Sequence, residues 1–371
     1  MRIISDAEVQ TTILPRLSLS SLLHSQALAF QSLRPSSSAN RTIAQCPPRL
    51  SLRTPSHTQL FMPARTHTPN SVVKIVSVPT PNSAAGSGIP GVNLLFDDLT
   101  GRLSHVVNST CLTALRTAAG SLASSVLALG AARGEVRRAV VFGDGAQAVM
   151  HVWLHQRYFG ALTEVCVVVG SHRQLCADEV LDKGKRFAAQ LEALPSPSRC
   201  SVKCISGQDR NAVQEALGDA SLVFTCTPST HPLFDHTDLT PSKRTHICAV
   251  GSYTPSMCEL PASLVRAASS ITGALVVDSI DACVAEAGCL LQALPSVDEL
   301  RTRCVELGGL LPPADGEEEG YLERVERQAV EYGMGEAGVT LFKSVGVGVQ
   351  DVEITKLVVA VAGGVGAEVA F

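Results

Sequence analysis

The sequence predicts an α/β fold whose main body is a doubly wound parallel sheet. One observation is an apolar run, 139–142, that passes through Gly143-x-Gly145-x-x-Ala148 into a segment with apolar residues at helical spacing. The other is that further short apolar runs follow, separated by polar and helical segments. A chain that alternates strands and helices in this way builds a parallel sheet covered by helices. The further runs are 165–169, 222–226, 247–251 and 274–278.

The glycine-containing loop after the first of these strands has the pattern of a dinucleotide-binding turn. Gly143 allows a tight turn, Gly145 lets a pyrophosphate approach the backbone, and the small Ala148 lets the helix pack close to the strand. The amides of the first helical turn and the helix dipole then hold the phosphates. We therefore expect Gly143, Gly145, Ala146 and Gln147 to contact the pyrophosphate.

Composition bounds the class of protein. The chain has 371 residues, enough for two domains. Its net charge of −4, with no long basic block, excludes the electrostatic surface of a nucleic-acid-binding protein. The sequence has no stretch of about 20 uncharged apolar residues and no continuous apolar leader, so we expect neither a membrane span nor secretion. Its twelve cysteines are scattered, mostly in apolar segments, which is typical of free thiols in a reducing compartment and predicts a cytoplasmic location.

Two pairs of potential metal ligands have simpler explanations. Cys200-x-x-x-Cys204 has no second pair or histidine partner nearby in the sequence. His151 and His155 share a helix face but lack a third ligand, so we expect them to be packing or solvent-edge residues. The sequence therefore predicts no metal site.

The N-terminal third predicts a small β-rich domain with helices. Ser5 followed by Glu8 has the pattern of a capping box that opens a helix, and Pro15 is expected to end it. The Ser-rich run 18–53 predicts an interrupted helix and a loop. Extended segments are expected at 48–52, 60–64, 72–78 and 91–97, and the third of these places Lys74 between apolar neighbours.

A long helix is expected from Ser109 to the strand before the glycine loop. Its apolar residues recur at helical spacing, at Leu112, Leu115, Ala119, Leu122 and Val126. Arg116 lies near the first turn, where the helix dipole disfavours a cation unless an anion compensates. Arg116 is therefore either a surface residue or a residue that clamps a carboxylate.

Seven segments, taken together and in order, resemble the ornithine cyclodeaminase/mu-crystallin family. The resemblance covers nearly the whole chain. The segments are Leu112-Thr113-Ala114-Leu115-Arg116-Thr117-Ala118-Ala119, Gly143-x-Gly145-x-Gln147-Ala148, Thr225-Cys226-Thr227-Pro228-Ser229, Ala249-Val250-Gly251-Ser252-Tyr253-Thr254-Pro255 with Glu259-Leu260, Val277-Asp278-Ser279, Glu286-Ala287-Gly288, and 341–351.

The resemblance implies a two-domain, usually dimeric protein. A Rossmann-type domain, here 120–335, would be inserted into an α+β substrate-binding and dimerisation domain made of 1–119 and 336–371. The family's substrate carboxylate is held by two arginines and a lysine, which match Arg49, Lys74 and Arg116. A planar guanidinium can contact both carboxylate oxygens while Lys74 adds a point charge. This gives Arg116 a physical reason to lie near the helix start.

One loop departs from the pattern of the true cyclodeaminases. Those proteins carry an aspartate, thought to act as acid and base, where this sequence has Tyr253, and a lysine where it has Met257. The pKa of a tyrosine is ordinarily near 10, so Tyr253 cannot replace the anionic base. Ornithine cyclisation is therefore put in doubt. The loop looks more like that of the ketimine and cyclic-imine reductases of the family, which reduce a C=N bond with NAD(P)H.

The end of the second strand of the nucleotide domain indicates which cofactor is preferred. NAD-preferring Rossmann domains place a carboxylate there, whereas here Gly170-Ser171-His172-Arg173 follows, with no carboxylate until Asp178. NADP(H) is therefore favoured over NAD(H), with Ser171 and Arg173 at the 2′-phosphate. The alternative is that Arg173 only caps the turn. Near the nicotinamide ribose we expect Thr227, Pro228 and Ser229.

The resulting hypothesis is the reduction of a cyclic imino carboxylate to a cyclic amino acid of the proline or pipecolate type. Lys74 and Tyr253 are the candidate catalytic residues, and either water or Tyr253 supplies the proton that activates the imine. Tyr253 as a packing residue of its loop remains open. Three other functions also remain: an ornithine cyclodeaminase, an alanine-type amino-acid dehydrogenase, and a non-catalytic, crystallin-like nucleotide-binding protein.

Overall fold

The computed structural model describes residues 1–34, 44–80, 83, 89–171, 173–195, 200–240, 243–294, 296–332 and 338–370. The chain divides into two compact units. The first unit consists of Met1–Arg116, Pro313–Tyr321 and Val347–Phe371, and the second of Thr117–Pro312 and Leu322–Gly346. The sequence had suggested bounds at 119/120 and 335/336, and it had given 313–321 to the nucleotide domain.

Residues 313–321 belong to the first unit because they pack on its helix α2 (Leu19–Ser32). The amide of Ala314 donates to Oε1 of Gln31 at 3.0 Å, and its carbonyl is 2.9 Å from Nε2 of His24. The ring of Tyr321 meets that of His24 edge to face, with 5.2 Å between centroids. These contacts involve residues about 290 positions apart, which is why no local pattern predicted them.

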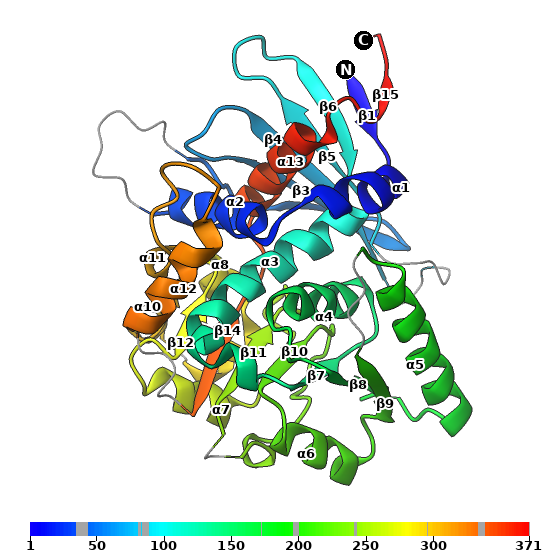
Figure 1. Ribbon diagram of the computed structural model, residues 1–371, viewed down its shortest axis with the longest axis vertical. Coiled ribbons are helices and arrows are strands. Elements are labelled where there is room, and N and C mark those ends of the chain that lie inside the picture. Colours follow the sequence, from blue (N-terminus) through cyan, green and yellow to red (C-terminus); the bar gives the residue numbers. More distant parts are fainter. Residues whose placement is uncertain are drawn as a thin grey trace. The chain divides into compact units, whose positions relative to one another are not determined.

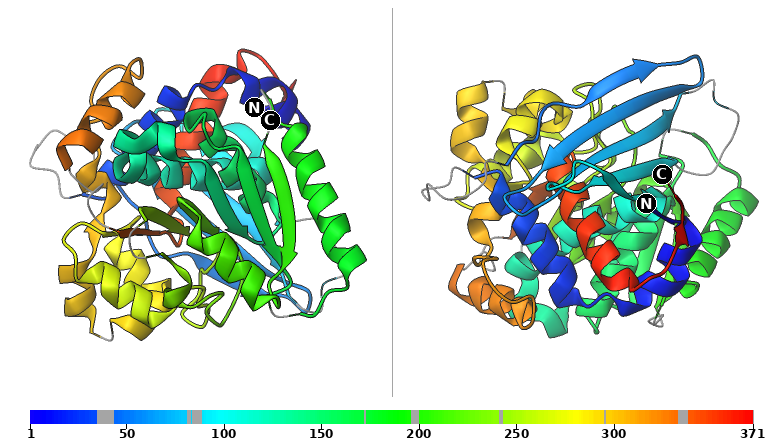
Figure 2. Two further views of the ribbon diagram at one scale, coloured as in Figure 1. Left: turned by 60° about the horizontal axis from the view of Figure 1, so that its bottom comes forward. Right: turned by 90° about the horizontal axis from the view of Figure 1, so that it is seen from above.

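The first unit contains a seven-stranded sheet of order β15-β1-β6-β5-β4-β3-β2. Helices α2 and α13 (Gly348–Ala362) pack together and α13 lies on strands β3, β4 and β5 (Figure 2, right). The α+β prediction for this unit is confirmed. The strands are β1 (Arg2–Ile4), β2 (Leu50–Arg53), β3 (His57–Arg65), β4 (Ser71–Pro79), β5 (Gly91–Phe96), β6 (Leu103–Asn108) and β15 (Ala367–Glu368).

The start of the chain follows its sequence signals only in part. Ser5 and Glu8 form the predicted capping box, and Ser5 caps helix α1 (Asp6–Glu8), which continues as a π-helical turn and ends in a 3-10 turn that contains Pro15. The prediction of an interrupted helix after residue 18 was wrong. Ser18 and Ser21 form a second capping box, and α2 then runs uninterrupted to Ser32 because it buries a stripe of apolar residues. Residues 35–43 lie outside the described part.

The second unit contains an eight-stranded sheet of order β13-β12-β14-β11-β10-β7-β8-β9, in which every pair of neighbouring strands is parallel. Helices lie on both faces of this sheet (Figure 2, left), and the predicted doubly wound α/β fold is confirmed. The strands are β7 (Arg138–Phe142), β8 (Glu164–Val169), β9 (Ser201–Ser206), β10 (Leu222–Thr225), β11 (Thr245–Ala249), β12 (Leu275–Val277), β13 (Val305–Glu306) and β14 (Val339–Lys343).

Strand β14 is the clearest difference from the sequence prediction. Its residues had been assigned to the returning first domain, but β14 lies between β11 and β12 in the parallel sheet. Its run Val-Thr-Leu-Phe-Lys is buried on both sides, as is usual for a central parallel strand. The helices between the glycine loop and β14 are α4 (Ala146–Tyr158), α5 (Ala177–Glu192), α6 (Arg210–Gly218), α7 (Ala262–Ser269), α8 (Ile280–Glu286), α9 (Gly288–Ala293), α10 (Val297–Arg303), α11 (Leu307–Leu310) and α12 (Tyr321–Tyr332).

The predicted long helix is α3 (Thr110–Leu129). Together with the turn that follows it, α3 is long and apolar enough to cross a membrane, but 94% of its most apolar 18-residue window is buried within the protein. Such burial is typical of a core helix, and Leu112, Leu115, Leu122 and Val126 are all fully buried.

His151 and His155 on α4 are fully buried packing residues, one of the two roles expected for them. Nδ1 of His151 donates to the carbonyl of Gln147 and its Nε2 accepts from Ser121, at 2.7 and 2.8 Å. His155 makes the equivalent contact with Ser125 at 2.9 Å. Burial lowers the pKa of His151 to about 4, so this imidazole is neutral.

Candidate active site

The glycine loop of the second unit follows β7, where the strand order changes direction between β7 and β10 (Figure 1). Ligands of open parallel sheets bind at the carboxyl ends of the strands at such a point. Gly143 has a φ of 104°, and a Cβ at this position would lie 3.0 Å from the carbonyl oxygen of Cys226 in the loop after β10. The predicted tight turn therefore requires glycine for two independent reasons, the positive φ and the close loop.

Gly145 differs from Gly143, because nothing lies within 4 Å of the Cβ it lacks. It is the N-cap of α4, and its φ of −85° suits any residue. The open space lies beside the first-turn amides of Ala146 and Gln147, where an anion is favoured by the helix dipole. Ala148 is fully buried, as close packing of α4 requires. The loop therefore fits the pyrophosphate of a dinucleotide.

The end of β8 forms a turn that closes with the amide of Arg173 donating to the carbonyl of Gly170, whose φ is 68°. The side chain of Gln208 donates to the carbonyl of Ser171. The exposed guanidinium of Arg173 is 2.8 Å from Oε1 of Glu179, which lies in the first turn of α5. Ser171 and Arg173 thus lie in the turn after β8, and the guanidinium of Arg173 has a carboxylate partner in Glu179.

The loop after β10 is fixed by a buried glutamate. Thr227 donates from its amide and its hydroxyl to Oε1 of Glu259, at 2.7 and 2.9 Å, and Gly251 donates its amide to Oε2 at 2.8 Å. Burial raises the pKa of Glu259. The predicted cofactor residues Thr227 and Ser229 are therefore part of a rigid loop, in which Ser229 also accepts from the amide of His231. Tyr253 lies half-buried in the loop that Glu259 ties down after β11.

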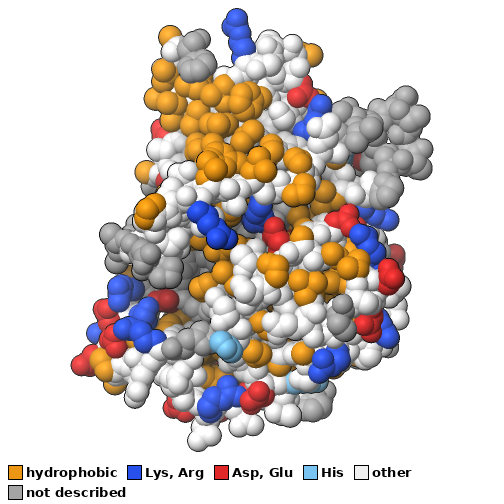
Figure 3. All heavy atoms as spheres, turned by 180° about the vertical axis from the view of Figure 1, so that it is seen from behind, with side chains coloured by type: hydrophobic (Ala, Val, Ile, Leu, Met, Phe, Trp, Pro, Cys, Tyr) orange, Lys and Arg blue, Asp and Glu red, His pale blue; other side chains and the backbone are white. Residues whose placement is uncertain are grey.

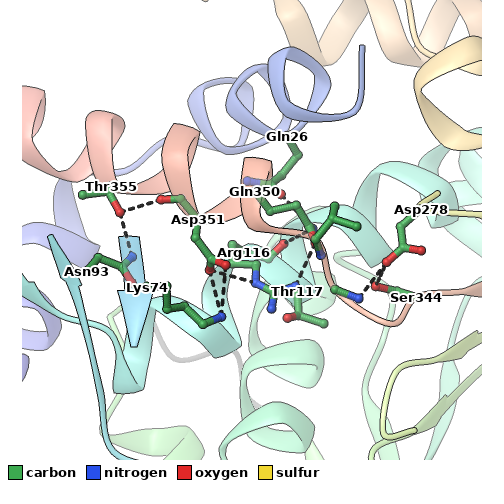
Figure 4. Close-up of polar contacts among 12 residues, drawn as sticks. Gln26, Lys74, Asn93, Arg116, Thr117, Asp278, Ser344, Gln350, Asp351 and Thr355 are labelled. Atoms are coloured by element: carbon green, nitrogen blue, oxygen red, sulfur yellow. Dashed lines mark hydrogen bonds and ion pairs between the residues drawn. The ribbon is translucent and has the colours of Figure 1, made fainter. Parts of the chain in front are cut away.

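A second buried network holds the ends of β11, β12 and β14. Nζ of Lys343 donates to the carbonyls of Ala249, Ser252 and Ser344, at 3.1, 3.2 and 2.8 Å. Asp278 accepts from the hydroxyl of Ser344 at 2.7 Å and from the two amides that follow it (Figure 4). Buried charges satisfied in this way act as rigid clamps on the loops that carry the nucleotide site.

The first unit carries a cluster of buried charges. Nζ of Lys74, on β4, is 3.0 and 3.1 Å from the two carboxylate oxygens of Asp351 on α13. Nε of Arg116, on α3, is 3.3 Å from Oδ1 of the same carboxylate, and its NH1 donates to Oε1 of Gln350 at 2.8 Å (Figure 4). Lys74, Arg116 and Asp351 are at most 5% exposed. The structure therefore brings two of the three predicted carboxylate-binding residues together.

Arg49 lies half-buried just before β2 in the same unit. Its charge and that of Arg116 both lower the pKa of Lys74, whereas Asp351 raises it. Burial is the largest cause of the shift, and the pKa of Lys74 is lowered to about 8. Lys74 is thus mostly protonated at pH 7, because its pKa lies about one pH unit higher. All three predicted cations lie in one unit, and the charge of Arg49 reaches Lys74, which Asp351 links to Arg116.

Sequence reasoning missed the residues that hold these groups. Asp351, Gln350, Glu259, Asp278 and Lys343 all lie in segments that carried the family resemblance, but they were given no role. No local signal distinguished Asp351, because Gln350, Glu353 and Lys356 give the start of its helix a mixed polar and apolar character. Nothing in the sequence identified Lys74 and Arg116 as its partners.

A parallel sheet with a dinucleotide loop, and buried cations in the other unit, are features of nucleotide-dependent proteins that act on small carboxylates. The chain belongs to the ornithine cyclodeaminase/mu-crystallin family, whose model matches residues 17–363. The family resemblance seen in the sequence is confirmed.

Curated relatives share a little over a quarter of their residues with this chain. It is 28% identical over 351 residues to a Δ1-pyrroline-2-carboxylate reductase of Bacillus cereus, covering 93% of each chain. It is also 28% identical over 265 residues to the ketimine reductase mu-crystallin of mouse, covering 71% of this chain and 67% of the relative.

Solved structures share the fold over the full length. The Δ1-pyrroline-2-carboxylate reductase of Thermococcus litoralis, in complex with NADH and L-proline, superposes with a TM-score of 0.72 at 20% identity, covering 100% of both chains. A lysine cyclodeaminase superposes with a TM-score of 0.73 at 20% identity, covering 100% of this chain and 95% of that one. An archaeal alanine dehydrogenase dimer with bound NAD gives 0.70 at 20% identity, covering 100% and 99%. This likeness shows the fold.

Proposed function

We propose that this protein uses NAD(P)H to reduce a cyclic imino carboxylate to a cyclic amino acid such as proline or pipecolate. The observation that carries the proposal is the buried cation cluster of Lys74 and Arg116, in a chain whose other unit has a complete dinucleotide loop. Relatives named as pyrroline-2-carboxylate and ketimine reductases support the same reaction class.

In this proposal the chain's own residues bind and orient the substrate. A reduced nicotinamide, when bound, supplies the hydride. Arg49, Lys74 and Arg116 hold the substrate carboxylate, which fixes the position of the neighbouring C=N bond. A proton on the imine nitrogen makes its carbon electrophilic, and that proton comes from water or from Tyr253. Lys74 and Tyr253 remain the candidate catalytic residues.

A cyclodeaminase or an alanine-type dehydrogenase would need ammonia as product or co-substrate. Tyr253 stands where the cyclodeaminases have an aspartate, so an anionic base is missing from that position, and this favours the simple reductase. Ammonia release from ornithine would establish the cyclodeaminase. A rate that depends on added ammonia would establish the dehydrogenase, and nucleotide binding without any turnover would establish the crystallin-like alternative.

The finer cofactor preference is also part of the proposal. Structural neighbours with bound cofactor carry NADH or NAD+. We propose that this chain prefers NADPH, because Ser171 and Arg173 follow β8 where an NAD-preferring domain has a carboxylate. Glu179 must release the guanidinium of Arg173 before that group can bind a 2′-phosphate. The preference is therefore expected to be moderate.

We further propose a homodimer in the cytoplasm. On β3, β4 and β5, alternate residues face away from the buried side and form a half-exposed apolar surface, and Figure 3 shows hydrophobic side chains gathered in a broad area. Such surfaces usually mark an interface. All twelve cysteines are free thiols, which suits a reducing compartment. The residues of the surface are Phe61, Pro63, Val73, Ile75, Val92, Leu94 and Phe96.

The test is oxidation of NADPH and NADH, followed at the nicotinamide absorbance, with Δ1-pyrroline-2-carboxylate and Δ1-piperideine-2-carboxylate. Arg116→Ala is expected to lower kcat/KM at least about 30-fold, because losing one partner of a buried charged contact costs about 2 kcal/mol or more. Arg102→Ala, an exposed arginine of the same unit, is the matched control and should behave as wild type. Absence of turnover with both rings, despite measurable nucleotide binding, would refute the proposed function.

A further inference from the structure

Asp351 occupies an unusual position for a carboxylate. It lies in the first turns of α13, is 1% exposed, and contacts two cations that come from different segments of the chain, β4 and the start of α3 (Figure 4). Both cations are among the residues assigned to substrate binding under the proposed function. Asp351 itself was assigned no role.

The contacts of Lys74 and Arg116 restrict the orientation of both side chains. Lys74 is held through two contacts to one carboxylate, at 3.0 and 3.1 Å. NH1 of Arg116 donates a hydrogen bond to Oε1 of Gln350, and its Nε lies 3.3 Å from Oδ1 of Asp351 in an ion pair that lacks hydrogen-bond geometry. Gln350 is itself fixed by Gln26, at 3.0 Å. Side chains locked in this way need no reorganisation when a ligand arrives.

The carboxylate also sets the charge of the cluster. A buried lysine beside a buried arginine would lose its proton, because burial and the neighbouring cation both oppose its charge. The groups that act on Lys74 are Asp351 from α13, Arg116 from α3 and Arg49 from the segment before β2. The thiol of Cys46, near Asp351 and Arg49, has a raised pKa and stays neutral. Of the charged groups that act on Lys74, Asp351 is the one that carries a negative charge, and it therefore favours the protonated form of the lysine.

We propose that Asp351 is a positioning residue for substrate binding: it holds Lys74 and Arg116 in one orientation and keeps Lys74 positively charged, so that the pair can bind a substrate carboxylate. Lys74, Arg116 and Asp351 together carry one net positive charge and Arg49 adds a second, so the cluster still attracts an anionic substrate. The inference rests on the proposed function, since it assumes that these cations meet the substrate.

The test compares Asp351→Asn, Asp351→Glu and the wild type as full-length protein with saturating NADPH. Asp351→Asn has nearly the same shape but no charge, so Lys74 should lose its proton at lower pH. We expect KM for Δ1-pyrroline-2-carboxylate to rise about tenfold or more at pH 7.5, with a much smaller change in kcat. The basic limb of the kcat/KM profile, near pH 8 in the wild type, should move to lower pH. Asp351→Glu should recover part of the loss.

A matched control is available on the same helix. Glu353 is buried like Asp351, but its carboxylate accepts hydrogen bonds from Thr68 and Lys356 rather than from the cluster. Glu353→Gln should keep the wild-type KM and pH profile. A wild-type KM and an unmoved basic limb in Asp351→Asn would overturn the proposal. If Asp351→Asn does not fold, Asp351→Glu decides, since the displaced carboxylate should still raise KM and an unchanged KM would overturn the proposal.

Binding of pyrrole-2-carboxylate, a planar and unreactive carboxylate, separates this inference from the proposed function. Calorimetry on the protein with NADP+ should show weaker binding to Asp351→Asn than to the wild type, and binding to the wild type should weaken above pH 8. If the wild type turns over no imine but shows this pattern, the proposed reaction fails and the role of Asp351 stands. Equal affinities for the two proteins would overturn the role of Asp351, whatever the reaction.

Discussion

Acidification should unfold this protein through three buried histidines of the second unit. His151 and His155 on α4 and His246 on β11 are all fully buried. Burial lowers the pKa of His151 to about 4, that of His246 to about 3, and that of His155 well below its ordinary value. The folded state therefore holds them neutral, whereas the unfolded chain protonates them near pH 6.5.

The difference in histidine pKa between the folded and unfolded states sets the direction and the size of the change in unfolding free energy with pH. The stabilisation is fully present above pH 6.5 and is lost as the pH falls toward the folded-state pKa values, because only the unfolded chain takes up protons in that range. Each unit of pH below 6.5 removes about 1.4 kcal/mol per histidine, so His151 and His246 each account for roughly 2 kcal/mol at pH 5. His155 acts in the same direction, and these effects are a large share of the stability of an ordinary domain, which is about 5–15 kcal/mol.

The assay is urea unfolding at pH 7.5, 6 and 5, followed by the fluorescence of Trp153. This residue is the chain's one tryptophan. It is buried on α4, two positions after His151 and two before His155 in the sequence. His151→Gln and His246→Gln should each reduce the loss of stability between pH 7.5 and pH 5 by about 2 kcal/mol. His236→Gln, in a surface 3-10 turn, is the control. A pH dependence that is the same in all three variants and the wild type would refute the reasoning.

Further predictions concern the nucleotide site. Gly145→Ala should lose no more than about 1 kcal/mol of stability, because its φ and the open space accept a methyl group although alanine is a poorer N-cap than glycine. It should nevertheless bind NADPH about tenfold or more weakly, as isothermal calorimetry will show. Gly143→Ala should lower the melting temperature as well, because it combines a φ of 104° with a contact to the loop after β10. Glu179→Gln should release Arg173 and raise the ratio of kcat/KM for NADPH to that for NADH, whereas Arg173→Ala should lower it. Equal ratios in both variants would exclude Arg173 from cofactor choice.

Local signals in the sequence predicted the elements that depend on local physics. The capping box at Ser5, the alternation along β4, the apolar stripe of α3 and the glycine turn after β7 are each decided by neighbours within a few residues. The same signals could not place β14. Its apolar run suits any buried strand, and the choice of sheet depends on partners about 90 residues away on β11. Residues 313–321 were misassigned for the same reason.

In the candidate site, too, some residues were predicted from the sequence and others were not, but for a different reason. The residues proposed to touch the substrate were recognised because they match the family's motifs. Local chemistry added a second signal for two of them, a lysine inside a strand and an arginine at the positive end of a helix. In the folded protein Asp351 removes the conflict between these charges and their surroundings, but a residue that satisfies its neighbours produces no local anomaly of its own. The role of such a residue can be recognised only once its partner is known. Lys74 and Asp351 are 277 positions apart in the sequence, so their roles became clear only when the structure showed them in contact. When a sequence predicts a buried cation, a carboxylate partner that keeps it charged should therefore be sought, because a lysine buried without such a partner would lose its proton.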